Sequence, residues 1–214
     1  MCLSKSKILA IVLLSCIAVS EIHGAVIREG MFFNITSDDD SSIEAMASSA
    51  GYIDMEALKI ALVKEHNIVR KKHGAPALTY NKDLEVEAQR YAEVLGRKKK
   101  GLAHDMSNFK HGENLFALRR DEMPDAAELA KLTVDTFYAE KKFYQNGVYN
   151  PAGLHDYGHF TQMVWKNTKE VGVGAVVTPA KSLMGTPQFR VVVVMRYSPP
   201  GNILSKKQFA KNIE

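Results

Sequence analysis

The chain has 214 residues, a formal net charge of +4 and only two cysteines. This length allows one sizeable hydrophobic core or two very small ones. The small net charge gives little support for a polyanionic partner, so no nucleic-acid binding is expected. Both cysteines, Cys2 and Cys16, precede the expected folded part, which excludes a disulfide framework and a cysteine–zinc site there.

The first 24 residues have the layout of a secretory signal peptide. Lys5 and Lys7 precede an apolar run over residues 8–19, and small residues follow it. Cleavage is expected after Ser20 or after Gly24, and an uncleaved membrane anchor remains the alternative. The pattern predicts a secreted, extracellular protein.

Residues 25–50 form an expected flexible acidic leader. Their second half, TSDDDSSIEAMASSA, is acidic and nearly free of large apolar side chains, so it cannot bury enough surface to order itself. Asn34 begins an Asn-Ile-Thr triplet, which predicts N-glycosylation in a secreted chain. The folded domain is expected to span residues 51–214.

Three helices are predicted in the first half of this domain. Asp54 can cap a helix over residues 54–72, and Asn81 can cap a second over residues 81–97. A third is expected over residues 124–143, because it opens with a proline and acidic residues follow.

The second half has the composition of β-strands. Residues 170–177 are rich in valine and glycine, and residues 189–197 (FRVVVVMRY) are strongly β-forming. Prolines and glycine between them predict a loop, and hence an antiparallel hairpin. Helices followed by antiparallel strands indicate an α+β domain. The valine run over residues 191–194 is expected to be buried; exposed, it would favour self-association.

The standard catalytic signatures, including H-E-x-x-H, G-x-S-x-G and the P-loop, are absent from the sequence. His155 and His159 are four residues apart, so on a helix they would face the same way and could bind zinc. Residues 156–158 favour a loop, which weakens that interpretation.

Other polar residues have two interpretations each. Glu140 shares a predicted helix face with Phe137, where a carboxylate either finds a partner or stays exposed. Glu113 is a site residue or a loop-edge carboxylate, and His104 is a site residue or a surface histidine. His66 and Arg70, with Asn67 between them, are expected to form a structural polar network on the first helix, and Trp165 is expected in the core.

Four motifs occur in chain order: His66-Asn67-Ile68-Val69-Arg70, Gly112-Glu113-Asn114-Leu115, Gly158-His159-Phe160-Thr161-Gln162-Met163-Val164-Trp165 and Tyr197-Ser198-Pro199-Pro200-Gly201-Asn202. Together they resemble the CAP superfamily of cysteine-rich secretory proteins, antigen 5 and pathogenesis-related 1 proteins. The resemblance covers about residues 53–212.

This resemblance implies a three-layer α-β-α sandwich with a central, mainly antiparallel sheet. It also implies a cleft lined by two histidines and two glutamates, which by position are His104, Glu113, Glu140 and His159. Two imidazoles and two carboxylates suit zinc or another divalent cation.

In lacking cysteine in its folded part, and in its MVWKNTKEVGVG run, the chain resembles the Golgi-associated plant pathogenesis-related subgroup. That subgroup begins Met-Gly, which allows N-myristoylation. Here Cys2 follows the initiator methionine, so this modification is excluded and secretion is the better interpretation.

The resemblance implies a non-enzymatic extracellular binding protein, acting in defence or reproduction, with a sterol, fatty acid or protein as ligand. Phe143, Tyr144, Tyr149 and Tyr157 could grip such a ligand if exposed, and otherwise pack on the core. The alternative is a metal-dependent hydrolase or peptidase with Glu113 or Glu140 as general base. A monomer or weak homodimer is expected.

Overall fold

The computed structural model describes residues 53–98, 101–145, 149–182, 185 and 187–213. All of them belong to one compact unit of the chain. The predicted signal peptide with its two cysteines, the acidic leader and Asn34 lie outside the described residues, so these remain predictions.

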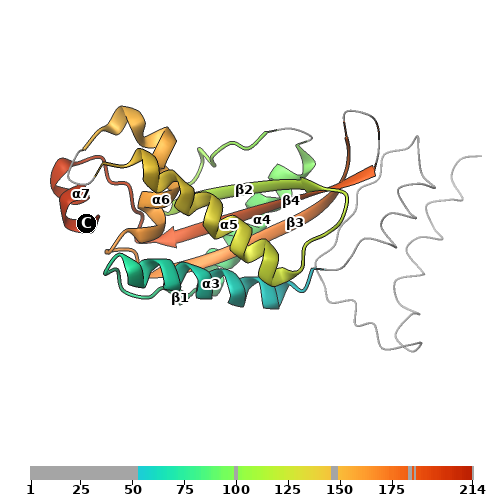
Figure 1. The fold of residues 1–214 in the computed structure, drawn as a ribbon, viewed down its shortest axis with the longest axis horizontal. Coiled ribbons are helices and arrows are strands. Elements are labelled where there is room, and N and C mark those ends of the chain that lie inside the picture. The colour runs from blue at the N-terminus through green and yellow to red at the C-terminus, as the bar shows by residue number, and fades with distance from the viewer. Residues whose placement is uncertain (1–52, 99–100, 146–148, 183–184, 186, 214) are drawn as a thin grey trace, which may run out of the picture. The chain divides into compact units, whose positions relative to one another are not determined.

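A mixed sheet of four strands, in the order β1-β3-β4-β2, forms the centre of the domain. Strands β3 (Glu170–Lys181) and β4 (Pro187–Ser198) make the predicted antiparallel hairpin. Strand β2 (Gly112–Arg120) pairs antiparallel with β4, and the short β1 (Thr79–Tyr80) pairs parallel with β3 (Figure 1). The sheet is therefore mainly antiparallel, as expected. Strands β1 and β2 were not predicted.

The three predicted helices are α3 (Met55–Lys72), α4 (Lys82–Arg97) and α5 (Ala126–Ala139). Each begins at a side-chain cap: Asp54 accepts from the backbone N–H of Ala57, and Asn81 and Asp125 act likewise for α4 and α5. The predicted third helix is shorter than expected. It ends as an α-helix at Ala139 and continues as a 3-10 turn over Glu140–Phe143.

The expectation of a loop at residues 156–158 is wrong. A 3-10 turn (Pro151–Gly153) leads directly into α6 (Leu154–Val164), so His155 and His159 both lie on a helix. Tyr157, Phe160 and Met163 are buried together, and this packing overrides the weak local preference of the segment. A last helix, α7 (Lys206–Asn212), follows the sheet.

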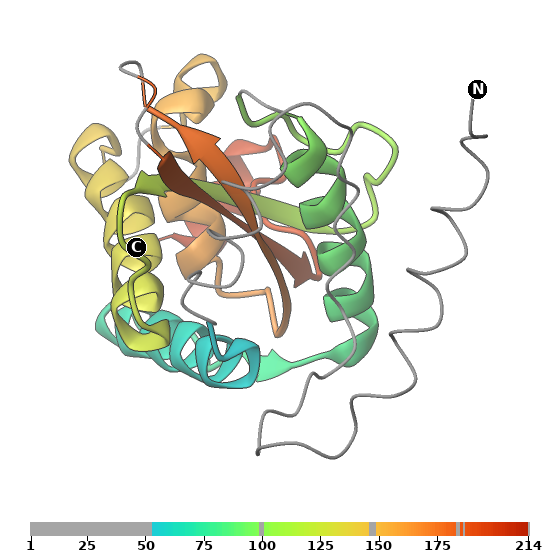
Figure 2. The same ribbon diagram turned by 90° about the vertical axis from the view of Figure 1, so that its right-hand side faces the viewer.

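Helices cover both faces of the sheet and make three layers (Figure 2). Helix α4 packs on β3 and β4 on one face, whereas α3, α5 and α6 pack together on the other. The core is divided accordingly, with a large cluster on the α3/α5/α6 side and a smaller one beneath α4. This is the predicted α-β-α sandwich, and the valines at 191–194 are buried in it as expected.

The glycines of β3 allow α4 to approach the sheet closely. A Cβ on Gly172 would lie 2.2 Å from the backbone nitrogen of Glu85, and one on Gly174 would lie 2.2 Å from that of Gln89. Val171 and Val173, which alternate with these glycines, face the larger core. The Val-Gly alternation thus reflects two different neighbours on the two faces of one strand.

Candidate functional site

The first pair of site residues joins the loop before β2 to β2 itself. The Nδ1–H of His104 donates to Oε1 of Glu113 at 2.7 Å, and the backbone N–H of Asp105 donates to the same oxygen at 3.1 Å. The hydrogen bond with Glu113 raises the pKa of His104, although partial burial opposes the shift.

Arg196 neutralises the first pair from the neighbouring strand. Its guanidinium lies 3.0 Å from Oε2 of Glu113 and 2.7 Å from Oδ2 of Asp105. The guanidinium also lies 5.4 Å from the ring centroid of Tyr91 on α4. Glu113 and Arg196 are register partners across β2 and β4, so the sheet itself fixes this contact.

The second pair joins the end of α5 to α6. The Nδ1–H of His159 donates to Oε1 of Glu140 at 2.6 Å. Oε2 of Glu140 accepts from the backbone N–H groups of His159, at 2.9 Å, and Phe160, at 3.2 Å. Phe137 stacks on the imidazole of His159 with ring centroids 5.0 Å apart. Glu140 therefore has the partner that its position on an apolar helix face requires.

Two neighbouring residues at the start of β2 contact the two pairs differently. Glu113 contacts Arg196 on the face covered by α4. The next residue, Asn114, points to the other face, where its amide donates to the backbone carbonyl of His159 at 3.1 Å and to the hydroxyl of Tyr197 at 3.3 Å. Because successive side chains of a strand alternate between faces, Glu113 and Asn114 point to opposite faces of β2. Within the described residues, no hydrogen bond or ion pair joins one His–Glu pair to the other.

This arrangement does not fit a single zinc site with four protein ligands. Within the described ranges, no three His, Cys, Asp or Glu side chains come together as a metal-binding group. Each glutamate already accepts from the Nδ1–H of its histidine. Oε2 of Glu113 is buried and accepts no hydrogen bond in the described part of the chain, but the nearby Arg196 guanidinium balances its charge.

The other candidate residues belong to neither pair. His155 is exposed on α6 and its Nδ1–H donates to the carbonyl of Ala152 at 2.9 Å. Tyr144 and Tyr157 are buried and pack edge to face, with ring centroids 5.2 Å apart. Tyr149 packs against Phe209, whereas Phe143 is exposed.

The predicted polar network on the first helix is confirmed. Arg70 is fully buried, and its guanidinium donates to the backbone carbonyls of Pro76, Met163, Trp165 and Thr168. Burial lowers the pKa of Arg70 to about 10. Asn67 exchanges two hydrogen bonds with the backbone of Leu78. Trp165 is buried in the core, as expected.

His66 connects this network to the second pair. Its Nδ1–H donates to the carbonyl of Leu62 at 3.0 Å, and its Nε2 accepts from the hydroxyl of Tyr197 at 2.8 Å. That hydroxyl accepts in turn from Asn114, which also holds His159. Burial lowers the pKa of His66 to about 4, so the ring is neutral near pH 7.

Three of the four motifs meet at Gln162. Its Oε1 accepts from the backbone N–H of Gly201 at 2.9 Å. A Cβ on Gly112 would lie 2.0 Å from the same oxygen, so only glycine leaves room for the side chain. Most residues of the motifs therefore position the segments around the two pairs. Only Glu113 and His159 among them belong to a pair.

Three residues of the site were not found from the sequence: Asn114, Phe137 and Arg196. Arg196 carried one available signal, because a charged residue in the valine-rich run of β4 must find a carboxylate. Asn114 lies in a motif and Phe137 shares a helix face with Glu140, but their roles depend on contacts with His159, a residue distant in sequence.

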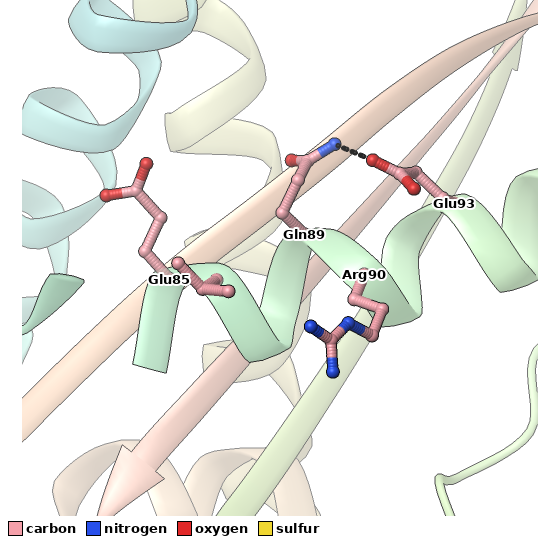
Figure 3. Close-up of a pocket in the computed structure, with 5 residues that line it drawn as sticks. Glu85, Gln89, Arg90 and Glu93 are labelled. Atoms are coloured by element: carbon pink, nitrogen blue, oxygen red, sulfur yellow. Dashed lines mark hydrogen bonds between the residues drawn. The ribbon is translucent and has the colours of Figure 1, made fainter. Parts of the chain in front are cut away.

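A pocket lies along α4 and includes no residue of either pair. It is lined by Glu85, Val86, Gln89, Arg90 and Glu93 (Figure 3). The amide of Gln89 donates to Glu93 at 3.4 Å, and its oxygen accepts from the backbone N–H of Ala175 at 3.0 Å. Gln89 thus satisfies the exposed edge of β3 beyond the short β1, which is a structural role.

No helix within the described ranges combines the length and the apolar character that a membrane span requires. Comparison with solved structures supports the fold. The crystal structure of NaASP2 with Zn²⁺ superposes with a TM-score of 0.53 at 21% identity, covering 72% of this chain and 85% of that chain.

Sequence comparisons identify the family. Golgi-associated plant pathogenesis-related protein 1 of Homo sapiens is 36% identical over 154 residues, which cover 71% of this chain and 89% of that protein. Pathogenesis-related protein 1B of Nicotiana tabacum is 32% identical over 67% of this chain and 76% of its own length. The chain spans less than half the length of other curated relatives that it matches. The model of the CAP, or cysteine-rich secretory protein, family matches residues 63–197, and the chain belongs to this family.

Proposed function

We propose that this protein is a secreted, non-enzymatic binding protein for an apolar ligand, a sterol or fatty acid, or for a protein partner. One observation carries the proposal: large apolar side chains are exposed beside both pairs. Met106 (71% exposed) and Phe109 (75% exposed) lie in the segment that joins His104 to Glu113. Phe143 is exposed three residues after Glu140. Exposed apolar groups next to charged ones are typical of binding surfaces.

The loop that carries Met106 and Phe109 is anchored by hydrogen bonds and an ion pair to α4 and β4. Asn108 donates to Oε2 of Glu87 on α4 at 2.6 Å, and the Nδ1–H of His111 donates to the same oxygen at 2.9 Å. Arg196 holds Asp105 at the start of the loop. The apolar side chains are therefore presented by an anchored segment, which lowers the entropy that a ligand must remove on binding.

Secretion is proposed on the N-terminal signal pattern and on the family to which the chain belongs. The name of the human relative refers to the Golgi, and the family description refers to secretory proteins. Expression of the tagged full chain tests this: secretion predicts protein in the medium, shortened by about 20–24 residues and sensitive to a glycosidase at Asn34.

Zinc is proposed only as a ligand of the two histidines taken separately. Within the described residues, Nε2 of His104 and Nε2 of His159 make no hydrogen bond, while the Nδ1–H groups donate to glutamates. A carboxylate on Nδ1 fixes the tautomer that leaves Nε2 open to a cation. The glutamates would then orient the imidazoles instead of binding the metal themselves.

The hydrolase alternative receives no support from the geometry of the glutamates. A general base needs an oxygen that can reach a substrate or water. Glu140 accepts hydrogen bonds from three donors, and Glu113 is buried against His104, Asp105 and Arg196. Both carboxylates are committed to holding the structure.

Ligand binding is tested by titrating the purified secreted protein with a fluorescent sterol and a fluorescent fatty acid. Met106→Ser combined with Phe109→Ser should weaken saturable binding at least about tenfold, because the two side chains provide apolar contact area. Leu204→Ser, at another exposed apolar position, is the matched control. Absence of saturable binding by the unmodified protein would remove the lipid form of the proposal.

A further inference from the structure

The outer side of α3 carries an apolar and basic stripe that no described segment covers. Ile60 is 70% exposed and Ile68 is 41% exposed, and their spacing of eight residues puts them on one side of the helix. Lys64 lies between them, and Lys71 follows on the same side. Beside Ile68, the stripe borders a shallow hollow lined by Asn67 and by Gly74, Ala75 and Ala77.

The lysines of this stripe differ from Lys59, another lysine of α3, in having no ion-pair partner among the described residues. Lys59 is held by Glu56 at 2.9 Å and by Glu85 at 2.5 Å. Lys64 and Lys71 make no ion pair or hydrogen bond with any residue that the structure describes, and Lys72 ends the helix with a further positive charge. The stripe therefore combines exposed isoleucines with positive charge that lacks a partner.

We propose that residues 39–50 of the same chain, here called the acidic segment, dock on this stripe. The acidic segment, DDSSIEAMASSA, carries Asp39, Asp40 and Glu44. Their three negative charges complement the three positive charges of Lys64, Lys71 and Lys72. Its large apolar side chains are Ile43 and Met46. Only four residues separate the segment from the start of α3 at Met55, so docking costs little loop-closure entropy.

The acidic segment is long enough to reach the stripe if it runs antiparallel to α3. Along α3, Ile60 lies about 9 Å and Ile68 about 21 Å from Asp54, at 1.5 Å per residue. Met46 and Ile43 are eight and eleven residues before Asp54, which allows reaches of about 26 Å and about 36 Å. Ile43 and Met46 are at most about 10 Å apart, close to the spacing of about 12 Å between Ile68 and Ile60.

An antiparallel alignment therefore satisfies both the apolar and the charged groups. It places Met46 against Ile60 and Ile43 against Ile68, with Glu44 near Lys64. Asp39 and Asp40 then lie beyond Ile68, where Lys71 and Lys72 end the helix. In the full chain the acidic segment would mask the stripe, and its removal or neutralisation would expose it.

Zero-length carbodiimide cross-linking of the full chain tests the proposal. An equal mixture of unlabelled and ¹⁵N-labelled protein is cross-linked at low concentration and its peptides are identified by mass spectrometry. Docking predicts links from Asp39, Asp40 or Glu44 to Lys64, Lys71 or Lys72 within one isotope label. Links spread over distant lysines such as Lys110 and Lys207 would overturn the proposal, and so would mixed-label links, which would show docking between copies.

Two variants separate specific docking from general proximity. Ile68→Ser should reduce these links severalfold, whereas Ile203→Ser, which removes an exposed isoleucine elsewhere, should leave them unchanged. A chain with Asp39→Asn, Asp40→Asn and Glu44→Gln should acetylate at Lys64 and Lys71 about threefold faster than the parent, as the loss of weak surface ion pairs predicts. Equal acetylation rates in both chains would contradict docking.

Discussion

Arg70 of α3 donates through its guanidinium to the backbone carbonyl of Trp165 at 3.0 Å, at the end of α6. The same side chain bonds the carbonyls of Pro76, Met163 and Thr168. One buried arginine therefore joins the first motif of the sequence to the third, and it stabilises the position of the helix that carries His159.

Replacement of Arg70 by lysine should destabilise the domain by at least about 3 kcal/mol, because an ammonium group cannot reach all of these carbonyls. Urea denaturation followed by circular dichroism measures the change. Arg90→Lys, at an exposed position of α4, is the matched control and should change stability by less than about 0.5 kcal/mol. An equally small effect at Arg70 would show that the network contributes little.

His66 should make the domain less stable in mild acid. Its pKa is lowered to about 4 in the folded state, against an ordinary value of 6.5. Between these values the unfolded chain binds the extra proton, so stability falls as the pH drops through this window. The loss approaches about 3 kcal/mol when the pH reaches 4.

Denaturation curves at several pH values between 7 and 4 test this contribution. His66→Gln lacks the titrating ring and should show a shallower decrease in stability with falling pH than the parent protein, although it starts from a lower stability. Parallel curves for the two proteins would assign the acid sensitivity to other groups.

The close contact between α4 and β3 should make Gly174 intolerant of any side chain. Gly174→Ala brings a Cβ within 2.2 Å of the backbone of Gln89, and helix and strand must separate to accommodate it. A loss of about 1–3 kcal/mol is expected. In contrast, a Cβ on Gly158 of α6 meets its nearest neighbour at 3.6 Å, so Gly158→Ala should stabilise the helix by up to about 1 kcal/mol. Melting temperatures of both variants provide the comparison.

Zinc binding should depend on the two histidines independently. Since no three metal-type side chains come together within the described residues, His104→Ala and His159→Ala should each remove part of the binding measured by calorimetry, and their effects should add in the double variant. His155→Ala, in neither pair, should bind as the parent does. If either single substitution abolished binding completely, the two histidines would share one ion, contrary to this expectation.

Most of the fold could be predicted because its elements carry local signals. The caps Asp54 and Asn81 mark two helix starts, a proline followed by acidic residues marks the third, and the valine runs mark β3 and β4. Strand β2 was missed because its first residues are polar: Glu113 and Asn114 point to opposite faces and both find partners in other segments. Its pairing with β4 defines the strand, and no local pattern reveals such pairing.

The candidate site was predictable as a set of residues and not as an arrangement. Glu113 and His159 were marked by motifs, and the structure joins each to one of the other two residues of the predicted set, a pairing that the sequence did not indicate. The face on which Glu113 lies depends on the register of β2 against β4. The tyrosines at 144 and 157 are buried because Tyr157 lies on α6, where a loop was expected, and Tyr144 packs against it and Phe160.

Native mass spectrometry of the protein collected from the medium of secreting cells, before any chelator or detergent is added, tests the proposed function most directly. The account predicts that the parent protein retains an apolar small molecule, that Met106→Ser with Phe109→Ser loses it, and that Leu204→Ser keeps it. A spectrum showing only the bare polypeptide for all three proteins, with no lipid, sterol or protein bound, would contradict the account.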